Sequence, residues 1–515
     1  MGLETARIPN GWAHASLEAV CQILDSRRIP LNNSERSQRI AGKSADDLYP
    51  YYGATGQVGV IDDFIFDGEH VLLGEDGAPF LDPFKVKSYL VDGKFWVNNH
   101  AHILKSAVPN KYLCHYLNQI DYSDYVTGTT RLKLTQNALK RIPVLVAPIA
   151  EQRRIIAKIE ELFSELDKGI ESLKAARAKL NIYRQAVLKH AFEGKLTAQW
   201  REENKDKLET PEQLLAHIKQ EREARYEQQL TEWKTAVKEW EKGGKSGKKP
   251  TRSRMPKPVS TMAEEEIAHL ESLPSGWLWL TAESVGIVQL GRQRSPKNRS
   301  KDYPTKYIRA ANITEKGLDL DDVLDMDFLP HELSAYRLKK GDLVLSEASG
   351  SAAQVGKPAI WDDQIPNCCF QNTVIRHQPY CRDYAVYLLW LYRFFYVSGK
   401  FAQVAGGVGI NHLSAFKFAQ IALPLCSLAE QQESVRLLEE RFATIEWQER
   451  EIDSALNQAE MLRQSILKKA FTGQLVPQDP RDEPASVLLD RIKAEREKAA
   501  QNNHSKKTKK RKTTA

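Results

Sequence analysis

The sequence predicts an α+β protein: two mixed α/β domains are joined and separated by two long antiparallel coiled-coil helices, which form an internal pseudo-two-fold repeat. Three observations support this fold class. The 515 residues are too many for one hydrophobic core, two long segments of the sequence repeat each other, and a heptad pattern follows each predicted domain. Hydrophobic residues make up 42% and charged residues 27% of the chain, as in soluble folded proteins.

The repeat begins with a Pro-x-Gly-Trp motif at residues 9–12, which returns at residues 274–277. A second motif, Ala-Glu-Gln, occurs at residues 150–152 and again 279 residues later, at 429–431. After the second motif the two copies align without a gap for over 40 residues, whereas between the motifs they hardly resemble each other. The pattern indicates one scaffold that carries two different globular inserts.

The repeat divides the chain into six segments. In order, these are a first mixed domain at 1–148, a repeated helix at 149–200, a charged helix and basic linker at 201–272, a second mixed domain at 273–427, a second repeated helix at 428–475, and a C-terminal helix and basic tail at 476–515.

The two repeated helices carry apolar residues with a 4-3 spacing, which is typical of a heptad seam. Examples are Ile159, Phe163 and Leu166 in the first helix and Leu438, Phe442 and Ile445 in the second. A related pair of units closes most simply about a two-fold axis, which sets equivalent helices antiparallel. We therefore predict an antiparallel two-helix spacer. The alternative is that each helix packs only on its own domain.

The domains mix strand and helix patterns. Short strands are predicted at 57–61, 94–97, 306–309 and 342–345. A long buried helix is predicted to begin near Tyr384 with Asp383 as its N-cap. Residues 212–241 are predicted to form a highly charged helix.

Several features exclude secretion and membrane spanning. The chain has no signal peptide, and its longest apolar run, 384–397, is only 14 residues long and contains Arg393. Six cysteines without a C-x-x-C spacing argue against a disulfide framework and a zinc site. We expect a cytoplasmic protein with no membrane partner.

The net charge of +7 is unevenly distributed. Residues 242–258 hold seven Lys or Arg and the tail at 506–512 holds six, so the remainder of the chain is acidic overall. A basic tail is either a solvated tail or a loose nucleic-acid contact. If the folded part binds nucleic acid, it must do so through local basic patches.

No catalytic, metal or cofactor site is recognisable. The run Gly350–Pro358 resembles a phosphate-binding loop, but it has five residues between the glycines, and Pro358 replaces the Ser or Thr that would hold magnesium. We predict that the chain is not an enzyme. The alternative in the enzyme class is a nuclease or methyltransferase with an unrecognised site.

DNA contact is better supported, because both domains carry a basic loop and a polar loop at matching places. A basic loop lies near the start of each domain, and a second polar loop lies just before each repeated helix. Such cations suit phosphates, and Asn or Gln amides can pair with adenine as Arg does with guanine. The residues selected are Arg27, Arg28, Arg36, Arg39, Asn98, Asn99, Thr129, Arg131 and Lys133 in the first domain, and Arg292, Arg294, Lys297, Arg309, Gln371, Asn372, Asn411 and His412 in the second.

With these motifs, the chain resembles the specificity subunit of type I restriction–modification enzymes over nearly its whole length. The residues that carry the resemblance are the two repeated motifs above, the run from Arg184 to Arg201, the segments 51–56 and 73–77 in the first domain, and the segments 307–313 and 345–351 in the second. The resemblance adds five candidates for DNA binding, namely Tyr52, Thr55, Asn312, Ser346 and Ser349. The charged segment 203–258 departs from the family pattern, and its role stays open.

The resemblance implies a non-catalytic subunit whose two target-recognition domains each read half of a bipartite, asymmetric site in double-stranded DNA. It implies two methyltransferase subunits docked on the helices, and restriction subunits that translocate and cleave DNA. S-adenosylmethionine, ATP and magnesium would then belong to these partners, with adenine methylated on a flipped base. The alternative is a coiled-coil scaffold whose domains bind protein partners rather than DNA.

Overall fold

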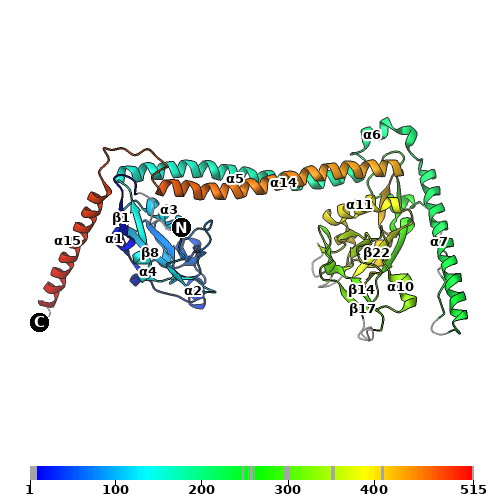
Figure 1. Cartoon of the computed structure of the whole chain (residues 1–515), viewed down its shortest axis with the longest axis horizontal. Coiled ribbons are helices and arrows are strands. Elements are labelled where there is room, and N and C mark those ends of the chain that lie inside the picture. Colours follow the sequence, from blue (N-terminus) through cyan, green and yellow to red (C-terminus); the bar gives the residue numbers. More distant parts are fainter. Residues whose placement is uncertain are drawn as a thin grey trace. The chain divides into compact units, whose positions relative to one another are not determined.

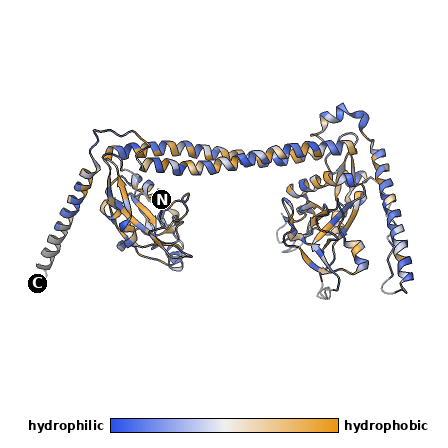
Figure 2. Cartoon of the chain, in the orientation of Figure 1, coloured by the Kyte–Doolittle hydropathy of each residue, from blue (hydrophilic) through white to orange (hydrophobic). Residues whose placement is uncertain are grey.

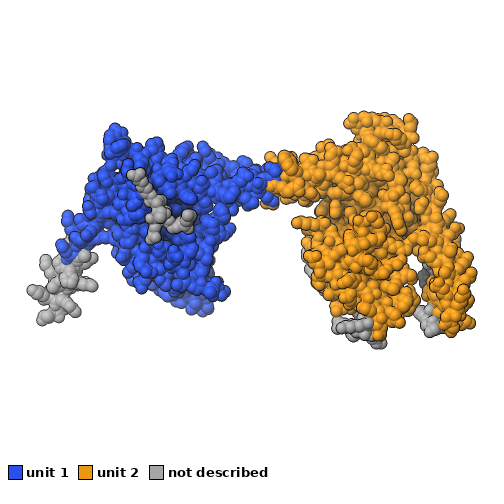
Figure 3. All heavy atoms as spheres, in the orientation of Figure 1, with its two compact units in different colours: residues 1–176, 451–515 blue, residues 177–450 orange. Residues whose placement is uncertain are grey.

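The chain folds into two compact units, which are coloured separately in Figure 3. Unit 1 contains residues 1–176 and 451–515, and unit 2 contains residues 177–450. The computed structural model describes residues 8–245, 249–252, 255, 259, 261–294, 302–349, 354–406 and 411–512. Each unit holds one mixed domain and a part of each long helix.

The domain of unit 1 contains a two-stranded, a four-stranded and a three-stranded sheet (Figure 1). Their strands, in sheet order, are β1 (Ala13–Ser16) and β11 (Pro143–Val146); β2 (Cys21–Ile23), β8 (Ala101–Ser106), β5 (His70–Gly74) and β6 (Ser88–Val91); and β4 (Gly56–Ile61), β3 (Tyr49–Gly53) and β7 (Trp96–Val97). The domain also contains helices α1 (Leu17–Val20), α2 (Asn33–Ile40), α3 (Asn110–Gln119) and α4 (Gln136–Arg141) and the short strand pair β9 (Val126–Thr127) and β10 (Lys133–Leu134).

The domain of unit 2 repeats this arrangement although its sequence differs. Its corresponding sheets are β12 (Leu278–Thr281) with β24 (Ala422–Leu425); β13 (Gly286–Leu290), β22 (Val374–Pro379), β18 (Leu343–Ser346) and β20 (Pro358–Ile360); and β17 (Leu324–Asp327), β14 (Pro304–Ile308) and β21 (Cys369–Phe370). In both three-stranded sheets one pair is antiparallel and the other parallel. The four strands predicted from sequence correspond to β4, β7, β14 and β18, although β7 contains only two residues.

One helix start differs from the prediction. The buried helix α11 runs from Ala385 to Val397, and Asp383 lies before it in a 3₁₀ turn, Arg382–Tyr384. The N-cap is therefore Tyr384, and no side chain caps this helix. The physical reason is that the 3₁₀ turn leads directly into α11, so that Asp383 is already inside helical backbone.

The long helices α5 (Ile149–Phe192) and α14 (Leu428–Phe471) pack against each other within each unit. In unit 1, Ile155 and Ile159 of α5 share a core with Ile466 and Phe471 of α14. In unit 2, Val187 and Leu188 of α5 share a core with Leu438 of α14. The start of each helix thus lies along the end of the other, which is the antiparallel arrangement that a two-fold relation between the copies predicts. The alternative, in which each helix packs only on its own domain, is wrong.

A reciprocal contact marks this pairing. The guanidinium of Arg463 lies 4.3 Å from the ring centre of Phe163 in unit 1, and that of Arg184 lies 5.6 Å from the ring centre of Phe442 in unit 2. The arginines occupy equivalent positions in the two copies, as do the phenylalanines. Arg184 also donates to Glu449 at 2.9 Å. Each copy therefore supplies the cation for the aromatic ring of the other.

The two repeated motifs hold each domain on the helix pair. The indole Nε1 of Trp12 donates to Glu151 at 3.0 Å, and that of Trp277 donates to Glu430 at 3.1 Å. The glycine after each helix completes the contact. Gly473 and Gly194 have φ of +71° and +68°. A Cβ on either would lie within 2.7 Å of the proline of a Pro-x-Gly-Trp motif, Pro9 for Gly473 and Pro274 for Gly194. Each domain thus binds the start of its own helix and the end of the other copy's helix.

Helices α7 (Pro211–Lys242) and α15 (Ala485–Lys512) are also copies of each other. Leu214, Ile218 and Arg222 of α7 are buried in unit 2, while Ile492 of α15 is buried in unit 1. Figure 2 shows hydrophobic residues gathered in the strands of both domains, whereas α7 is mostly hydrophilic. None of the helices in the described part of the chain combines the length and the apolar character that crossing a bilayer requires.

Candidate nucleic-acid interface

In unit 1, a chain of polar contacts connects several predicted DNA-binding residues at the carboxyl end of β5. The backbone N–H of Asn98 donates to Tyr52 O at 3.0 Å, and Asn98 Oδ1 accepts from the His100 N–H at 2.8 Å. The His100 Nδ1 lies 2.6 Å from Asp76, which also accepts from Arg131 Nη2 at 2.7 Å. The fold thus brings Tyr52, Asn98 and Arg131 together from three separate parts of the sequence.

The neighbouring residue Glu75 connects this surface to a buried charge cluster. Its carboxylate accepts from Arg28 at 2.6 Å and lies 3.4 Å from the Lys133 ammonium. Beneath it, His102 Nδ1 lies 2.6 Å from the buried Asp25. The guanidinium of Arg28 therefore binds groups of the domain itself, whereas the Lys133 side chain is half exposed and can reach a ligand.

Asp25, Glu75 and His102 are grouped closely enough to be considered as metal ligands. The Arg28 guanidinium argues against this use, because it lies 2.6 Å from Glu75 and 3.5 Å from Asp25 and so already supplies a positive charge to both carboxylates. His102 completes the cluster, since its Nε2–H donates to Leu134 O at 2.9 Å and its Nδ1 faces Asp25. Burial alone would raise the pKa of Asp25, but the hydrogen bond and charge of His102, together with Arg28, lower it overall. The arrangement is that of an internal ion-pair network.

The first basic segment is not the loop that we predicted. Arg36 and Arg39 lie on α2, which begins because the Asn32 side chain accepts from the Glu35 N–H at 2.8 Å. Their guanidinium groups lie 5.0 Å from the ring centres of Tyr51 and Trp96. Arg27 is exposed and lies 4.8 Å from the Phe66 ring centre. These arginines pack on aromatic rings of the domain, and Arg39 also pairs with Asp62 at 2.7 Å.

In unit 2, the corresponding surface lies at the carboxyl end of β18. Asn411 and His412 form β23, which pairs antiparallel with β19 (Ala348–Ser349). His412 Nδ1 lies 3.2 Å from Glu347. The structure therefore brings the backbone of Ser349 together with Asn411 and His412. In unit 1 an antiparallel bridge brings Asp76 together with Lys133 in the same way, and we call the segments that contain Lys133 and His412 the pre-helix segments.

Other predicted residues of unit 2 are engaged within the fold. Asn312 is 3% exposed, and its amide donates to the carbonyls of Asp319 and Asp322 at 2.9 and 3.0 Å. The Ser346 hydroxyl is buried and accepts from the Lys357 N–H at 3.0 Å. Arg309 pairs with Asp322. Burial and internal hydrogen bonds argue against direct base contact by Asn312 and Ser346.

The second basic segment is likewise partly structural. Arg292 pairs with Glu332 at 2.8 Å and forms a parallel β-bridge with Gln371. The Asn372 N–H donates to Arg292 O at 3.1 Å. Arg294 is exposed, and Lys297 lies outside the described residues. In unit 1, Thr55, Asn99 and Thr129 are exposed.

Sequence reasoning missed Glu75 and Glu347 as parts of the site. Each follows directly on a buried strand and pairs with the cation before the repeated helix. A signal was present, because both carboxylates occupy the same place in the segments 73–77 and 345–351. Carboxylates repel phosphates, so the selection contained only cationic, amide and hydroxyl side chains.

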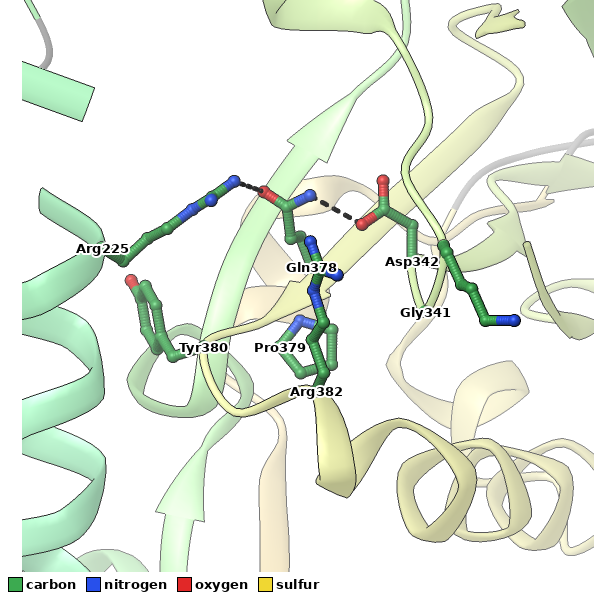
Figure 4. A pocket seen from close by; sticks show the side chains of 8 residues that line it. Arg225, Gly341, Asp342, Gln378, Pro379, Tyr380 and Arg382 are labelled. Carbon is green, nitrogen blue, oxygen red and sulfur yellow. Dashed lines mark hydrogen bonds between the residues drawn. The ribbon is translucent and has the colours of Figure 1, made fainter. Parts of the chain in front are cut away.

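The charged segment after the first repeated helix has a structural role that the sequence left open. Figure 4 shows Gln378 between Arg225 of α7 and Asp342, beside a small cavity that Tyr380 and Arg382 also line. Gln378 accepts from Arg225 at 3.1 Å and donates to Asp342 at 2.7 Å. Burial raises the pKa of Asp342. These polar contacts, with Ile218 and Leu214, fix α7 on the second domain.

The two domains share one topology, and each is held on the same pair of helices. Their polar surfaces lie at the same strand end but differ in sequence. These features define a modular two-domain recognition protein. The family model for the type I restriction modification DNA specificity domain matches residues 9–175 and 278–458. The chain therefore belongs to the family of type I restriction–modification specificity proteins. Its function is recognition of a DNA target, rather than that of a scaffold for protein partners alone.

Individual relatives agree with this membership. The EcoDI specificity subunit of Escherichia coli is 23% identical over 96% of this chain and 97% of its own length, and the EcoKI subunit of strain K12 is 24% identical over 77% and 71%. A Haemophilus influenzae relative is 32% identical over 148 residues, which span 28% of this chain and 36% of that protein. The fold is shared with a chain from a solved structure that describes complex assembly and conformational transition of a type I restriction–modification system. The TM-score is 0.57 at 16% identity, and the match covers 91% of this chain and 99% of that one.

Proposed function

We propose that each domain reads one half of a bipartite, asymmetric DNA target, and that the chain directs adenine methylation or ATP-dependent restriction by partner subunits in the cytoplasm. One observation carries this proposal: both domains keep the same sheets and anchors, whereas the candidate DNA-binding side chains near the ends of β5 and β18 differ. A shared frame with unlike reading surfaces suits a target whose halves are unlike.

The proposal assigns the chemistry to the partners. Two methyltransferase subunits would bind S-adenosylmethionine, and restriction subunits would use ATP and magnesium to translocate and cleave DNA. This chain would supply sequence recognition and no catalytic group. Of the predicted DNA-binding residues, Arg131, Lys133, Asn98 and Tyr52 in unit 1 gather at one surface, as do Asn411 and His412 in unit 2.

The experiment is to map methylated adenines in cells that express the chain with its methyltransferase partner. Residues 13–133 are then replaced by the corresponding insert of another family member, which leaves Trp12 and its bond to Glu151 in place. We expect one half of the methylated motif to change and the other half to stay the same. A change in both halves, or methylation that ignores the replacement, would contradict the proposal.

A further inference from the structure

The same carboxylate–cation pair occurs in both domains at the proposed DNA surface. Glu75 lies 3.4 Å from the Lys133 ammonium, and Glu347 lies 3.2 Å from His412 Nδ1. In both pairs the carboxylate is mostly buried, with 13% and 15% of the side chain exposed, whereas the cation is 51% and 49% exposed. Burial and pairing are therefore alike, although the partner of the carboxylate has changed from lysine to histidine, which is a cation only when protonated.

Matching backbone hydrogen bonds show that the two pairs are structurally equivalent. The N–H of Leu134 donates to Glu75 O at 2.7 Å, and that of Leu413 donates to Glu347 O at 2.8 Å. Each leucine directly follows the paired cation in the sequence. Each glutamate thus accepts a hydrogen bond from the leucine through its backbone carbonyl and pairs with the cation through its side chain. Two otherwise divergent inserts have retained this arrangement.

A half-exposed cation next to DNA binds phosphates of any sequence, which raises non-specific affinity. A carboxylate beside it opposes this, because it repels phosphates and competes for the cation. In domain 2, withdrawing His412 also removes the ion pair of the mostly buried Glu347, which is unfavourable. Contact with the phosphate backbone of DNA alone therefore gains little binding free energy by drawing the cation away from its carboxylate.

We propose that Glu75 and Glu347 restrain Lys133 and His412 and thereby lower the affinity for non-specific DNA, so that they act as specificity-determining residues. The inference rests on the proposed function of DNA recognition. Domain 2 offers the cleaner test, because Glu75 is also bound by Arg28, whereas the ion pair of Glu347 among the described residues is with His412.

The test compares Glu347→Gln with wild type in the full chain, using a double-stranded DNA of random sequence in a mildly acidic buffer in which histidine side chains carry a proton. We expect the affinity to rise about threefold and the slope of log affinity against log salt to steepen by about 0.9, as for one more phosphate contact. Asp325→Asn is the matched control, since it removes one exposed carboxylate from β17 of the same domain. It should produce a smaller change.

His412→Ala tests the same idea from the other side and remains informative if Glu347→Gln does not fold. A restrained cation contributes little to random DNA, so His412→Ala alone should change this affinity less than twofold, and in the Glu347→Gln background it should abolish the increase. The inference is overturned if Glu347→Gln leaves non-specific affinity unchanged or weaker, if Asp325→Asn gives an equal increase, or if His412→Ala alone strongly weakens binding. Failure of the wild-type chain to bind DNA at all would instead contradict the proposed function.

Discussion

The carboxylates of the two Ala-Glu-Gln motifs should differ in their contribution to stability, although they are the same residue of the same repeat. Glu430 is 2% exposed and accepts from Trp277, from Thr197 Oγ1 at 2.7 Å and from Arg201 Nε at 2.8 Å. Glu430→Gln removes the charge that Arg201 faces, and breaking a buried pair costs about 3 kcal/mol. The free energy of unfolding of unit 2 should fall by about this amount.

Glu151→Gln is the matched control. Burial raises the pKa of Glu151, so the charge is disfavoured in the folded state, and a glutamine can still accept from Trp12. We expect its effect to stay within about 1 kcal/mol in either direction. Amide hydrogen exchange at the starts of α14 and α5 measures both opening free energies in the full chain. Equal losses in the two variants, or no loss in Glu430→Gln, would refute this reading of the anchors.

Three further predictions follow from charge and helix length. Because the pKa of Asp25 is lowered, its stabilising contribution is present above the ordinary value of 3.8 and is lost as the pH falls below it, so Asp25→Asn should make acid unfolding of unit 1 less steep. Deleting Lys506 to Ala515 should reduce the salt slope of DNA binding without changing the methylated motif, and an altered motif would contradict this. If the long helices measure the target, one added heptad in each, near Leu173 and Ile452, should lengthen them by about 10 Å. The number of base pairs between the two half-sites should then rise by about three, or methylation should be lost. Normal methylation of half-sites at their original spacing would show that the helices do not measure this spacing.

The architecture could be predicted from sequence because it depends on repeated local patterns. The 4-3 spacing and the recurrence of two motifs identify both long helices, which begin at Ile149 and Leu428. The antiparallel pairing followed from symmetry alone. Helix α7 was predicted for the same reason, since its charged sequence contains no breaker between Glu212 and Glu241.

The candidate site could be predicted only in part, because its partners come from distant segments. Arg28 and Asn312 look like free ligands in the sequence, yet Arg28 meets Glu75, and Asn312 binds the turn at Asp319 to Asp322. Nothing local to either residue indicates these contacts. The basic residues could be selected from sequence because of their positive charge. The carboxylates proposed to restrain them could be identified only from the structure, which places the ends of β5 and β18 next to the pre-helix segments.

The anchors explain how two such different inserts can share one frame. The Trp–Glu bonds, the proline–glycine contacts and the reciprocal arginine–phenylalanine stacks all join residues that lie outside the inserts. The surfaces at the ends of β5 and β18, by contrast, take no part in these joints. Substitutions at the reading surface therefore leave the contacts that hold each domain on the helices unchanged. Recognition can diverge in one domain without a compensating change in the frame or in the other domain.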